Sequence, residues 1–195
     1  MSRILYVATS DIHIKTFHVP HIRWLKSQGH EVDLAIENRG GHAFDCVDQV
    51  HYLSFPRKLL SRVHPESFRR LREIIETGDY QLVHCHPPIP SALTRLAARR
   101  WRRQGGKVLY TAHGFHFYRG GPIARWLTYF PLEWFLGTFT DAIVTINRED
   151  YGHVKKDMRH KAPFLIPGIG IDSSRFSPLG DEDKARLRAE LGYQA

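Results

Sequence analysis

The stretch that decides the fold reads KVLYTAHGFHFYRGGP and runs from Lys107 to Pro122. It begins with the apolar residues Val108, Leu109 and Tyr110, which predict a buried strand. It then changes at once to histidines, aromatics, an arginine and glycines. Ligands of open α/β sheets bind just outside the carboxyl ends of the strands. The sequence therefore predicts a binding crevice directly after this strand.

Strands and helices alternate on both sides of this stretch. Short apolar runs predict strands at residues 3–8, 32–36, 50–53, 81–84, 107–111, 141–146 and 164–167. Helical spacing of apolar residues predicts helices at residues 17–28, 66–77 and 91–104. Residues 181–191 are expected to form one more helix, with Asp181 as its N-cap. The alternation predicts an α/β fold with a doubly wound, mostly parallel, Rossmann-like sheet.

Composition narrows the class of protein. The 195 residues suit one domain with a short appendage. Cys46 and Cys85 are too few for a disulfide framework, and the first strand follows Met1 without a signal peptide, so a cytoplasmic location is expected. The net charge of +8 favours an anionic partner: a phosphate-bearing substrate, an anionic membrane surface or nucleic acid. A basic surface that only aids solubility is the alternative.

Polar, titratable and glycine residues follow the predicted strands. The carboxyl ends of parallel strands lie at one edge of a sheet, so these residues are expected to converge there. They are Ser10, Asp11, His13, Glu37, Asn38, His84, His86, His113, His116, Asn147, Arg148, Glu149, Gly168 and Gly170.

His113 is the leading candidate for chemistry. It follows directly on a buried strand, and Gly114 after it allows a ligand or backbone to come close. Its imidazole can donate a hydrogen bond or carry a proton near neutral pH. A histidine that only fixes its own loop is the alternative.

The segment His84-Cys85-His86 raises the question of a metal. Strand alternation puts both imidazoles on one face, and His113 is a conceivable third ligand. The spacing matches no closed zinc pattern, however, and no H-E-x-x-H motif occurs. The sequence thus favours polar lining of the crevice, with neither metal nor cofactor.

Residues 122–140 are rich in aromatics but do not predict a membrane span. Arg125 and Glu133 interrupt the apolar run, and Pro131 would kink a helix. Aromatics at helical spacing favour a kinked helix packed on the core, and contact with a membrane surface is the alternative.

The densest basic cluster is RRWRR at residues 99–103. A solvated helix face with Trp101 turned inward is expected, and contact with an anionic membrane is the second interpretation. No nucleic-acid-binding motif accompanies the cluster, so a nucleic-acid partner is not expected.

Four blocks of the chain resemble a known family. They are Ile12–His30 (IHIKTFHVPHIRWLKSQGH), Val83–Arg99 (VHCHPPIPSALTRLAAR), Tyr110–Pro122 (YTAHGFHFYRGGP) and Asp141–Tyr151 (DAIVTINREDY). A fifth, PGIGID at residues 167–172 with Phe176 after it, resembles the segment that leads into a second domain. The chain resembles the amino-terminal, acceptor-binding domain of a family 4 glycosyltransferase of the GT-B fold, of the bacterial type that assembles exopolysaccharide and capsule.

The resemblance implies an enzyme with two Rossmann-like halves. Residues 1–176 would form the acceptor domain, and residues 177–195 would begin the linker to a domain that binds a UDP- or GDP-sugar. The implied reaction transfers a sugar to a saccharide or polyprenyl-linked acceptor, with retention and without a metal. The implied location is the cytoplasm, with peripheral contact at the inner face of the cell membrane.

The resemblance also implies roles for single residues. His113 would be catalytic and would reach the transferred sugar. The substrate-binding residues would be Ser10, Asp11, His13, His84, His86, Gly114, Phe115, His116, Asn147, Arg148 and Glu149. The hinge to the second domain would be Pro167, Gly168, Gly170 and Asp172. The membrane or acceptor surface would include Arg119, Arg125 and Trp126.

Two features depart from the family pattern. The first loop, Ser10 to Lys15, has no glycine, and Pro90-Ser91 stands where a glycine pair is common. The residues after Phe176 are too few for the nucleotide-sugar domain, which is expected to come from elsewhere in the protein or from another subunit. We therefore expect no transfer by these residues alone. A non-catalytic module that binds a saccharide, a lipid-linked acceptor or a partner subunit is the alternative function.

Overall fold

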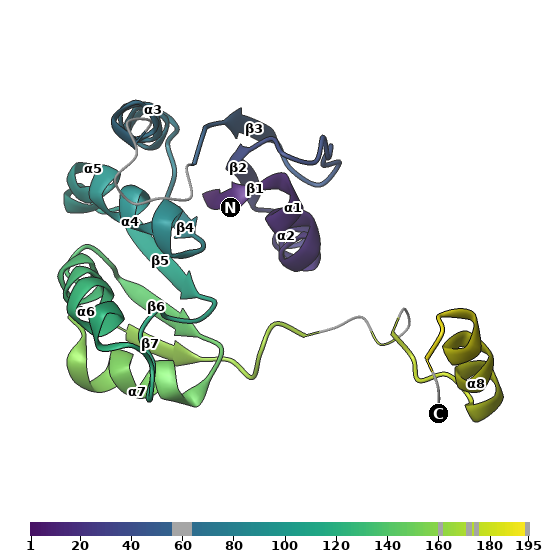
Figure 1. Ribbon diagram of the computed structural model, residues 1–195. Coiled ribbons are helices and arrows are strands. Elements are labelled where there is room, and N and C mark those ends of the chain that lie inside the picture. Colours follow the sequence, from purple (N-terminus) through teal and green to yellow (C-terminus); the bar gives the residue numbers. More distant parts are fainter. Residues whose placement is uncertain (56–63, 160–161, 171–172, 174–175, 194–195) are drawn as a thin grey trace.

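The structure is a computed structural model that describes residues 1–55, 64–159, 162–170, 173 and 176–193 (Figure 1). Its centre is a seven-stranded sheet in the order β3-β2-β1-β4-β5-β6-β7, in which every neighbouring pair is parallel. The strands are β1 (Arg3–Ser10), β2 (Glu31–Glu37), β3 (Gln49–Tyr52), β4 (Leu82–Cys85), β5 (Lys107–Ala112), β6 (Ala142–Thr145) and β7 (Ala162–Leu165). The predicted α/β, doubly wound class is confirmed.

The strand order places a topological switch between β1 and β4. The chain moves outward from β1 through β2 to β3, then returns to β4 and moves outward the other way. At the switch, Tyr6 pairs in register with His84 and Val7 with Cys85. Open α/β sheets bind ligands in the crevice at such a point, because the connecting loops diverge there. The residues that follow β1 and β4 are therefore the first place to look for a site.

Helices cover both faces of this sheet. The helices are α1 (Asp11–Phe17), α2 (Val19–Ser27), α3 (His64–Thr77), α4 (Pro88–Ala97), α5 (Arg99–Arg103), α6 (Ile123–Gly137), α7 (Arg148–Asp157) and α8 (Asp181–Glu190). Strand alternation splits the core in two. Ile4 and Tyr6 of β1 pack with α1 and α2, whereas Leu5 and Val7 pack on the face that holds α3, α4 and α5.

The first helix begins earlier than the sequence pattern predicts. Residues 10–15 were expected to form a loop, but β1 extends to Ser10 and α1 begins at Asp11. Ser10 is the N-cap, and its hydroxyl accepts a hydrogen bond from the His13 N–H. Pro20 stands in the first turn of α2, where its missing N–H costs nothing, and the chain breaks at His18 between the two helices.

Two other helices differ from the expectation, one in its existence and one in its N-cap. The helix α7 was not predicted, although Asn147 is a favourable N-cap whose side chain accepts from the Asp150 N–H. The helix α8 begins at Asp181 as expected, but Gly180 is its N-cap, so Asp181 lies in the first turn. Acidic residues there suit the positive end of the helix dipole. In Figure 1 this helix stands apart from the sheet, and it has no buried residue.

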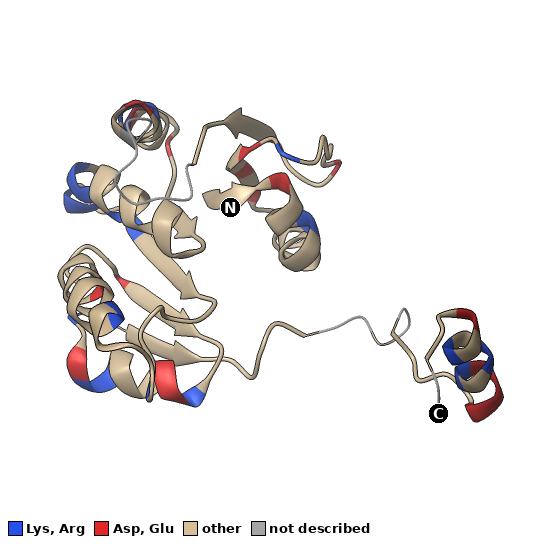
Figure 2. Ribbon diagram, in the orientation of Figure 1, with Lys and Arg blue, Asp and Glu red and all other residues tan. Residues whose placement is uncertain are grey.

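The helix expected at residues 91–104 is divided. It begins earlier, at Pro88, and breaks at Ala98 into α4 and α5. Trp101 of α5 is buried as predicted, while the flanking arginines make this helix largely blue in Figure 2. One of them, Arg102, places Nε 2.6 Å from an Asp141 carboxylate oxygen. Part of the basic cluster thus ties α5 to the start of β6.

The aromatic segment forms one helix, α6, with Pro131 inside it. Glu133, which argued against a membrane span, is buried and pairs with the fully buried Arg95 of α4 at 2.8 Å. The Arg95 guanidinium also lies 4.2 Å from the centroid of the Tyr110 ring. The helix is therefore anchored to the core, as predicted. Over the described part of the chain, every helix is too short or too polar to cross a bilayer.

Candidate functional site

Four imidazoles meet at the switch point of the sheet. They belong to His13 in α1, His18 at the end of α1, His86 just after β4 and His113 just after β5. One ring nitrogen of each lies within 4.8 Å of those of the other three. We call this group the histidine cluster. The structure thus brings three of the predicted site residues together, His13, His86 and His113, and adds His18.

Backbone geometry places each side chain of the cluster. The Ser10 hydroxyl holds the first turn of α1 through the His13 N–H at 3.4 Å. The His86 N–H donates to the Val7 carbonyl at 2.8 Å, which fixes this residue beside β1. Gly114, next to His113, has φ of 125°, a backbone conformation that is strained for any residue with a side chain. The glycine therefore lets the chain turn away immediately after His113.

Ring contacts join the cluster. His86 Nδ1 lies 3.1 Å from His113 Nε2, and the His18 and His86 ring centroids are 4.1 Å apart. His84 lies inside β4 rather than after it, because that strand continues to Cys85. Its Nε2 lies 2.8 Å from Thr111 Oγ1. His84 is thus tied to the neighbouring strand, and its ring lies 4.0 Å from that of His86.

Burial keeps these imidazoles neutral. Burial, together with a smaller contribution from neighbouring histidines, lowers the pKa of His13 to about 4 and that of His18 to about 2. It also lowers the pKa of His84 to about 3 and shifts those of His86 and His113 downward. A neutral imidazole offers one N–H donor and one acceptor nitrogen. The cluster therefore suits hydrogen bonds with uncharged groups such as sugar hydroxyls better than it suits charge pairing with phosphate.

Part of this hydrogen-bonding capacity is not used within the protein. The Nε2 atoms of His13, His18 and His86 are buried and have no hydrogen-bond partner among the described residues. His18 is 5% exposed and His86 is 1% exposed. A buried polar atom without a partner costs about 1–3 kcal/mol. Such atoms gathered at a switch point indicate a site that a ligand completes.

The carboxylate of Asp11 is engaged in hydrogen bonds within the protein. Its carboxylate is buried and accepts from the backbone N–H groups of Arg39, Gly40 and His42, each at 2.9 Å. Burial alone would raise the pKa of Asp11, but these hydrogen bonds lower it to about 2. The carboxylate thus anchors the loop after β2.

The polar residues after β6 form a separate group. The Asp150 carboxylate accepts from the Phe115 N–H at 3.2 Å and from Asn147 Nδ2 at 2.7 Å. Burial raises the pKa of Asp150. Glu149 accepts from the Arg119 N–H. The start of α7 therefore holds the loop that follows β5. Asp150 was not among the predicted site residues, although its spacing from Asn147 is that of a helix cap.

Two other predicted site residues, Phe115 and His116, pack on aromatic side chains of the β5 loop and of α6. Phe115 stacks on Phe117 at 4.9 Å, and His116 stacks on Tyr129 at 4.5 Å. Arg148 is exposed. These contacts place Phe115 and His116 in the packing between the β5 loop and α6, outside the histidine cluster.

The predicted surface and hinge residues lie in exposed segments. Arg119 and Arg125 are exposed, while Trp126 is half-buried and donates from Nε1 to the Tyr118 carbonyl at 3.1 Å. Gly168 and Gly170 follow β7 with φ of 80° and 74°, and Pro167 before them is exposed. Asp172 lies outside the described residues.

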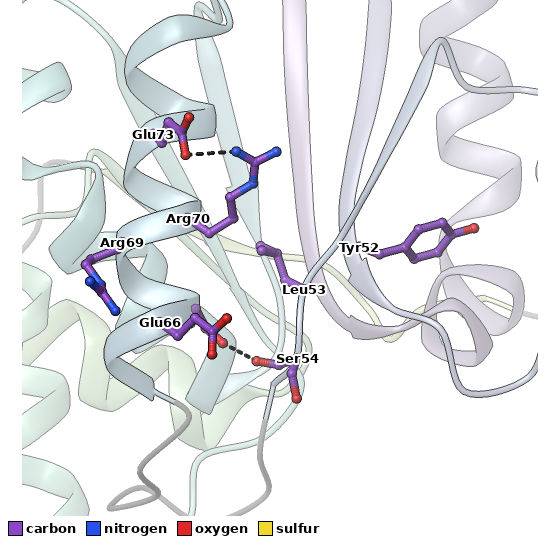
Figure 3. Close-up of a pocket in the computed structure, with 8 residues that line it drawn as sticks. Tyr52, Leu53, Ser54, Glu66, Arg69, Arg70 and Glu73 are labelled. Carbon is purple, nitrogen blue, oxygen red and sulfur yellow. Dashed lines mark hydrogen bonds and ion pairs between the residues drawn. The ribbon is translucent and has the colours of Figure 1, made fainter.

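One cavity of about 490 Å³ lies away from the histidine cluster, between the end of β3 and α3 (Figure 3). Its wall includes the exposed ion pair of Arg70 and Glu73, 2.8 Å apart, while the Tyr52 ring points away from α3. Its lining residues Ser54 and Glu66 flank in sequence residues 56–63, which lie outside the described part of the chain. We therefore base no function on it.

Comparison with known proteins places the chain among sugar-transferring proteins. The sequence model of Glycosyltransferase Family 4 matches residues 21–174. A Bacillus subtilis (strain 168) protein named "Putative glycosyltransferase EpsD" is 41% identical over 193 residues. This match covers 98% of the chain and 50% of the relative. The chain thus spans about half the length of this curated relative.

Solved structures share the fold. A crystal structure of Anabaena HepE in complex with UDP and glucose superimposes with a TM-score of 0.65 at 13% identity, covering 98% of this chain and 50% of that one. A glycosyltransferase from Rickettsia africae gives a TM-score of 0.59 at 15% identity, covering 100% and 50%. At these identities the likeness shows the fold alone. The fold confirms the prediction of one Rossmann-like half of a GT-B architecture.

Proposed function

The chain belongs to glycosyltransferase family 4, and from this premise we propose that it forms the acceptor-binding half of a sugar-transferring enzyme. The proposed reaction moves a sugar from a nucleotide-sugar donor to a saccharide or polyprenyl-linked acceptor, with retention and without a metal. Residues 1–176 would form the acceptor domain, and residues 177–195 would begin the linker. The matches over half the length of longer relatives support a second domain, in the same chain or in another subunit, that binds the donor.

The histidine cluster is the observation that carries this proposal. His113 stands at the carboxyl end of β5 beside His13 and His86, where a crevice between two domains would place the transferred sugar. Neutral imidazoles can donate to sugar hydroxyls and accept from them. In this proposal His113 contacts the transferred sugar, His13 and His86 bind its hydroxyls or those of the acceptor, and Ser10 positions His13.

The donor class is proposed as a UDP- or GDP-sugar. The Anabaena protein with this fold was solved with UDP and glucose, which supports a nucleotide-linked hexose. No cationic group belongs to the histidine cluster, so in this proposal the diphosphate is held by the second domain. Stabilisation of a departing diphosphate needs preorganised donors, and the isolated chain is expected to show no measurable turnover.

Replacement of His113 tests the proposal. The chain is joined to the carboxyl-terminal half of the Bacillus subtilis relative, and release of UDP or GDP is measured with His113→Ala. We expect a loss of at least about 100-fold with an unchanged melting temperature, because catalytic groups of this kind contribute about 10²–10⁴-fold. The exposed His21→Ala variant is the control and should transfer at the native rate. Native activity in His113→Ala would overturn the proposed role.

The isolated chain separates this function from its alternative, a non-catalytic module. Steady turnover by these residues without a second domain would contradict the two-domain proposal. Tight binding of a saccharide or lipid-linked acceptor, with no transfer in the joined protein, would favour the binding module.

Contact with an anionic membrane surface is proposed for the start of α6. Ile123 is 72% exposed and Leu127 is 71% exposed, one turn apart, and the exposed Arg119 and Arg125 lie nearby in the sequence. Apolar residues beside basic ones favour the interface of an anionic membrane. Replacing Ile123 and Leu127 by serine should reduce co-sedimentation with phosphatidylglycerol vesicles several-fold. Equal sedimentation of the native and the changed protein would reject this surface.

A further inference from the structure

We propose that His13, His18, His86 and His113 together bind one divalent transition-metal ion, with Zn²⁺ as the defining probe. The proposal goes beyond the transfer reaction proposed above, in which no metal takes part. It depends on the convergence of four imidazoles from separate elements, which offer one nitrogen each within 4.8 Å of one another. Spacing in the sequence could not reveal this set, because His18 joins it only through the break between α1 and α2.

The distances suit tetrahedral coordination. Zinc binds imidazole nitrogen at 2.0–2.1 Å, so two ligand atoms on a tetrahedral ion lie about 3.3 Å apart. His86 Nδ1 and His113 Nε2 are already 3.1 Å apart. The widest separation in the set, within 4.8 Å, has to shorten by about 1.5 Å to reach the tetrahedral spacing. The proposal requires that rotation of the rings about their side-chain bonds supplies this movement.

The unused nitrogens point to a ligand rather than to packing alone. Nε2 of His13, His18 and His86 lacks a hydrogen-bond partner among the described residues, and two of these side chains are more than nine-tenths buried. A metal ion would satisfy the Nε2 lone pairs of His13 and His18 and remove the cost of burying them, while His86 would bind through Nδ1, the atom that lies 3.1 Å from His113 Nε2. If these imidazoles only filled space in the core, we would expect their nitrogens to be hydrogen-bonded within the protein, or apolar residues to stand in their place.

The chemistry of the set selects the class of ion. All four ligands are imidazoles, which suit Zn²⁺, Co²⁺, Ni²⁺ and Cu²⁺, whereas Mg²⁺ and Ca²⁺ require oxygen ligands. Four protein ligands close a tetrahedral shell, and this is the pattern of sites that hold structure rather than activate water. The ion would join the α1–α2 segment to the ends of β4 and β5, and so would stabilise the folded chain.

The site would also limit the transfer reaction. The ring of His113 that would contact the transferred sugar is one of the four ligands, so metal binding and sugar binding compete for it. On this point the inference rests on the proposed function. In the joined two-domain protein, Zn²⁺ should inhibit transfer, and a chelator should restore it.

Metal binding to the chain without donor or acceptor is the direct test. The protein is treated with a chelator, dialysed and titrated with Zn²⁺ by calorimetry. One equivalent should bind, and the melting temperature should rise. His18→Gln should weaken binding at least tenfold, because loss of even an outer-shell partner costs about 10–100-fold. His21→Gln, a change at an exposed histidine in the next helix, should bind as the native chain does.

The titration overturns the proposal if no tight equivalent binds, or if His18→Gln and His21→Gln bind equally. Co²⁺ gives a second readout, since a tetrahedral site produces visible absorption bands that an octahedral surface site lacks. Should His18→Gln fail to fold by circular dichroism, the half-buried His13→Gln variant replaces it with the same expectation. Because no sugar takes part, failure here leaves the transfer proposal intact, and failure of transfer leaves metal binding intact.

Discussion

Two groups of buried polar side chains lie near β5, and they differ in charge and in how the protein pairs them. Between α4 and α6, Arg95 and Glu133 form a buried ion pair with Tyr110 beneath the guanidinium. Arg95 Nε also donates to the Ser91 carbonyl at 3.1 Å, whereas Arg95 Nη2 is buried without a hydrogen-bond partner among the described residues. At the switch point, by contrast, the histidine cluster is neutral and keeps three Nε2 atoms without a hydrogen-bond partner among the described residues.

This difference separates a structural group from a functional one. Charges that are buried are retained when partners surround them, and such a group fixes how its helices pack. In the histidine cluster, three neutral ring nitrogens from separate elements lack partners at one point of the sheet, and such a concentration is expected where a ligand or a reaction uses them. We therefore interpret the ion pair as the contact that fixes α6 to α4, and the histidine cluster as the candidate functional site.

Removing one partner of the ion pair gives the largest expected effect. Glu133→Ala leaves the Arg95 charge buried and uncompensated, and we expect a loss of about 3–5 kcal/mol in the free energy of unfolding. Urea denaturation measures it. Glu73→Ala is the matched control, because Glu73 pairs with Arg70 at the same 2.8 Å but on the exposed surface. That variant should lose no more than about 1 kcal/mol.

A double replacement sharpens the same contrast. Arg95→Met combined with Glu133→Leu removes both charges, and similar replacements elsewhere have been neutral or stabilising. We expect the double variant to be far more stable than Glu133→Ala. If it is equally unstable, the ion pair contributes more than its charges, and the simple structural interpretation is wrong.

Asp11 provides the second test, with a smaller expected effect. Asp11→Ala leaves the N–H groups of residues 39, 40 and 42 without their acceptor, and we expect a loss of about 1–3 kcal/mol. Amide hydrogen exchange at residues 39–42 should become faster. Asp45→Ala is the control, since among the described residues its carboxylate pairs only with Arg23, on the exposed surface. Unchanged exchange in Asp11→Ala would mean that this carboxylate is free to bind substrate, as the sequence alone suggested.

The role of Asp11 shows where reasoning from sequence ends. The alternation of apolar runs predicted all seven strands of the sheet, and the rule for parallel sheets predicted that residues after β1, β4 and β5 converge. That Asp11 serves the loop after β2 depends on the path of residues 39–42, which no local pattern specifies. His18 was missed for a related reason. A single helix was expected at residues 17–28, and only Pro20 hinted that the chain breaks just before it.

The third test is the dependence of the free energy of unfolding on pH, which probes the neutral state of the histidine cluster. Its expected effect per residue is the smallest of the three. Burial lowers the pKa of His18 from 6.5 to about 2. Below about pH 6.5 the unfolded chain therefore binds a proton at His18 that the folded chain does not, so stability falls as the pH falls. One such site contributes up to about 1.4 kcal/mol per pH unit.

His18→Leu should therefore reduce this slope. In chelator-containing buffer, urea midpoints between about pH 7 and pH 5 should fall less for His18→Leu than for the native chain, by roughly the contribution of one proton. At pH 7 the variant should be within about 1 kcal/mol of the native stability, since replacing a buried polar group that lacks a partner by an apolar one costs little. His21→Leu, at an exposed position whose charge is the smallest of the causes that lower the His18 pKa, should keep a slope close to the native one. Equal slopes in the native chain and both variants would mean that His18 takes up its proton when folded, and the contrast with the charged pair between α4 and α6 would then fail.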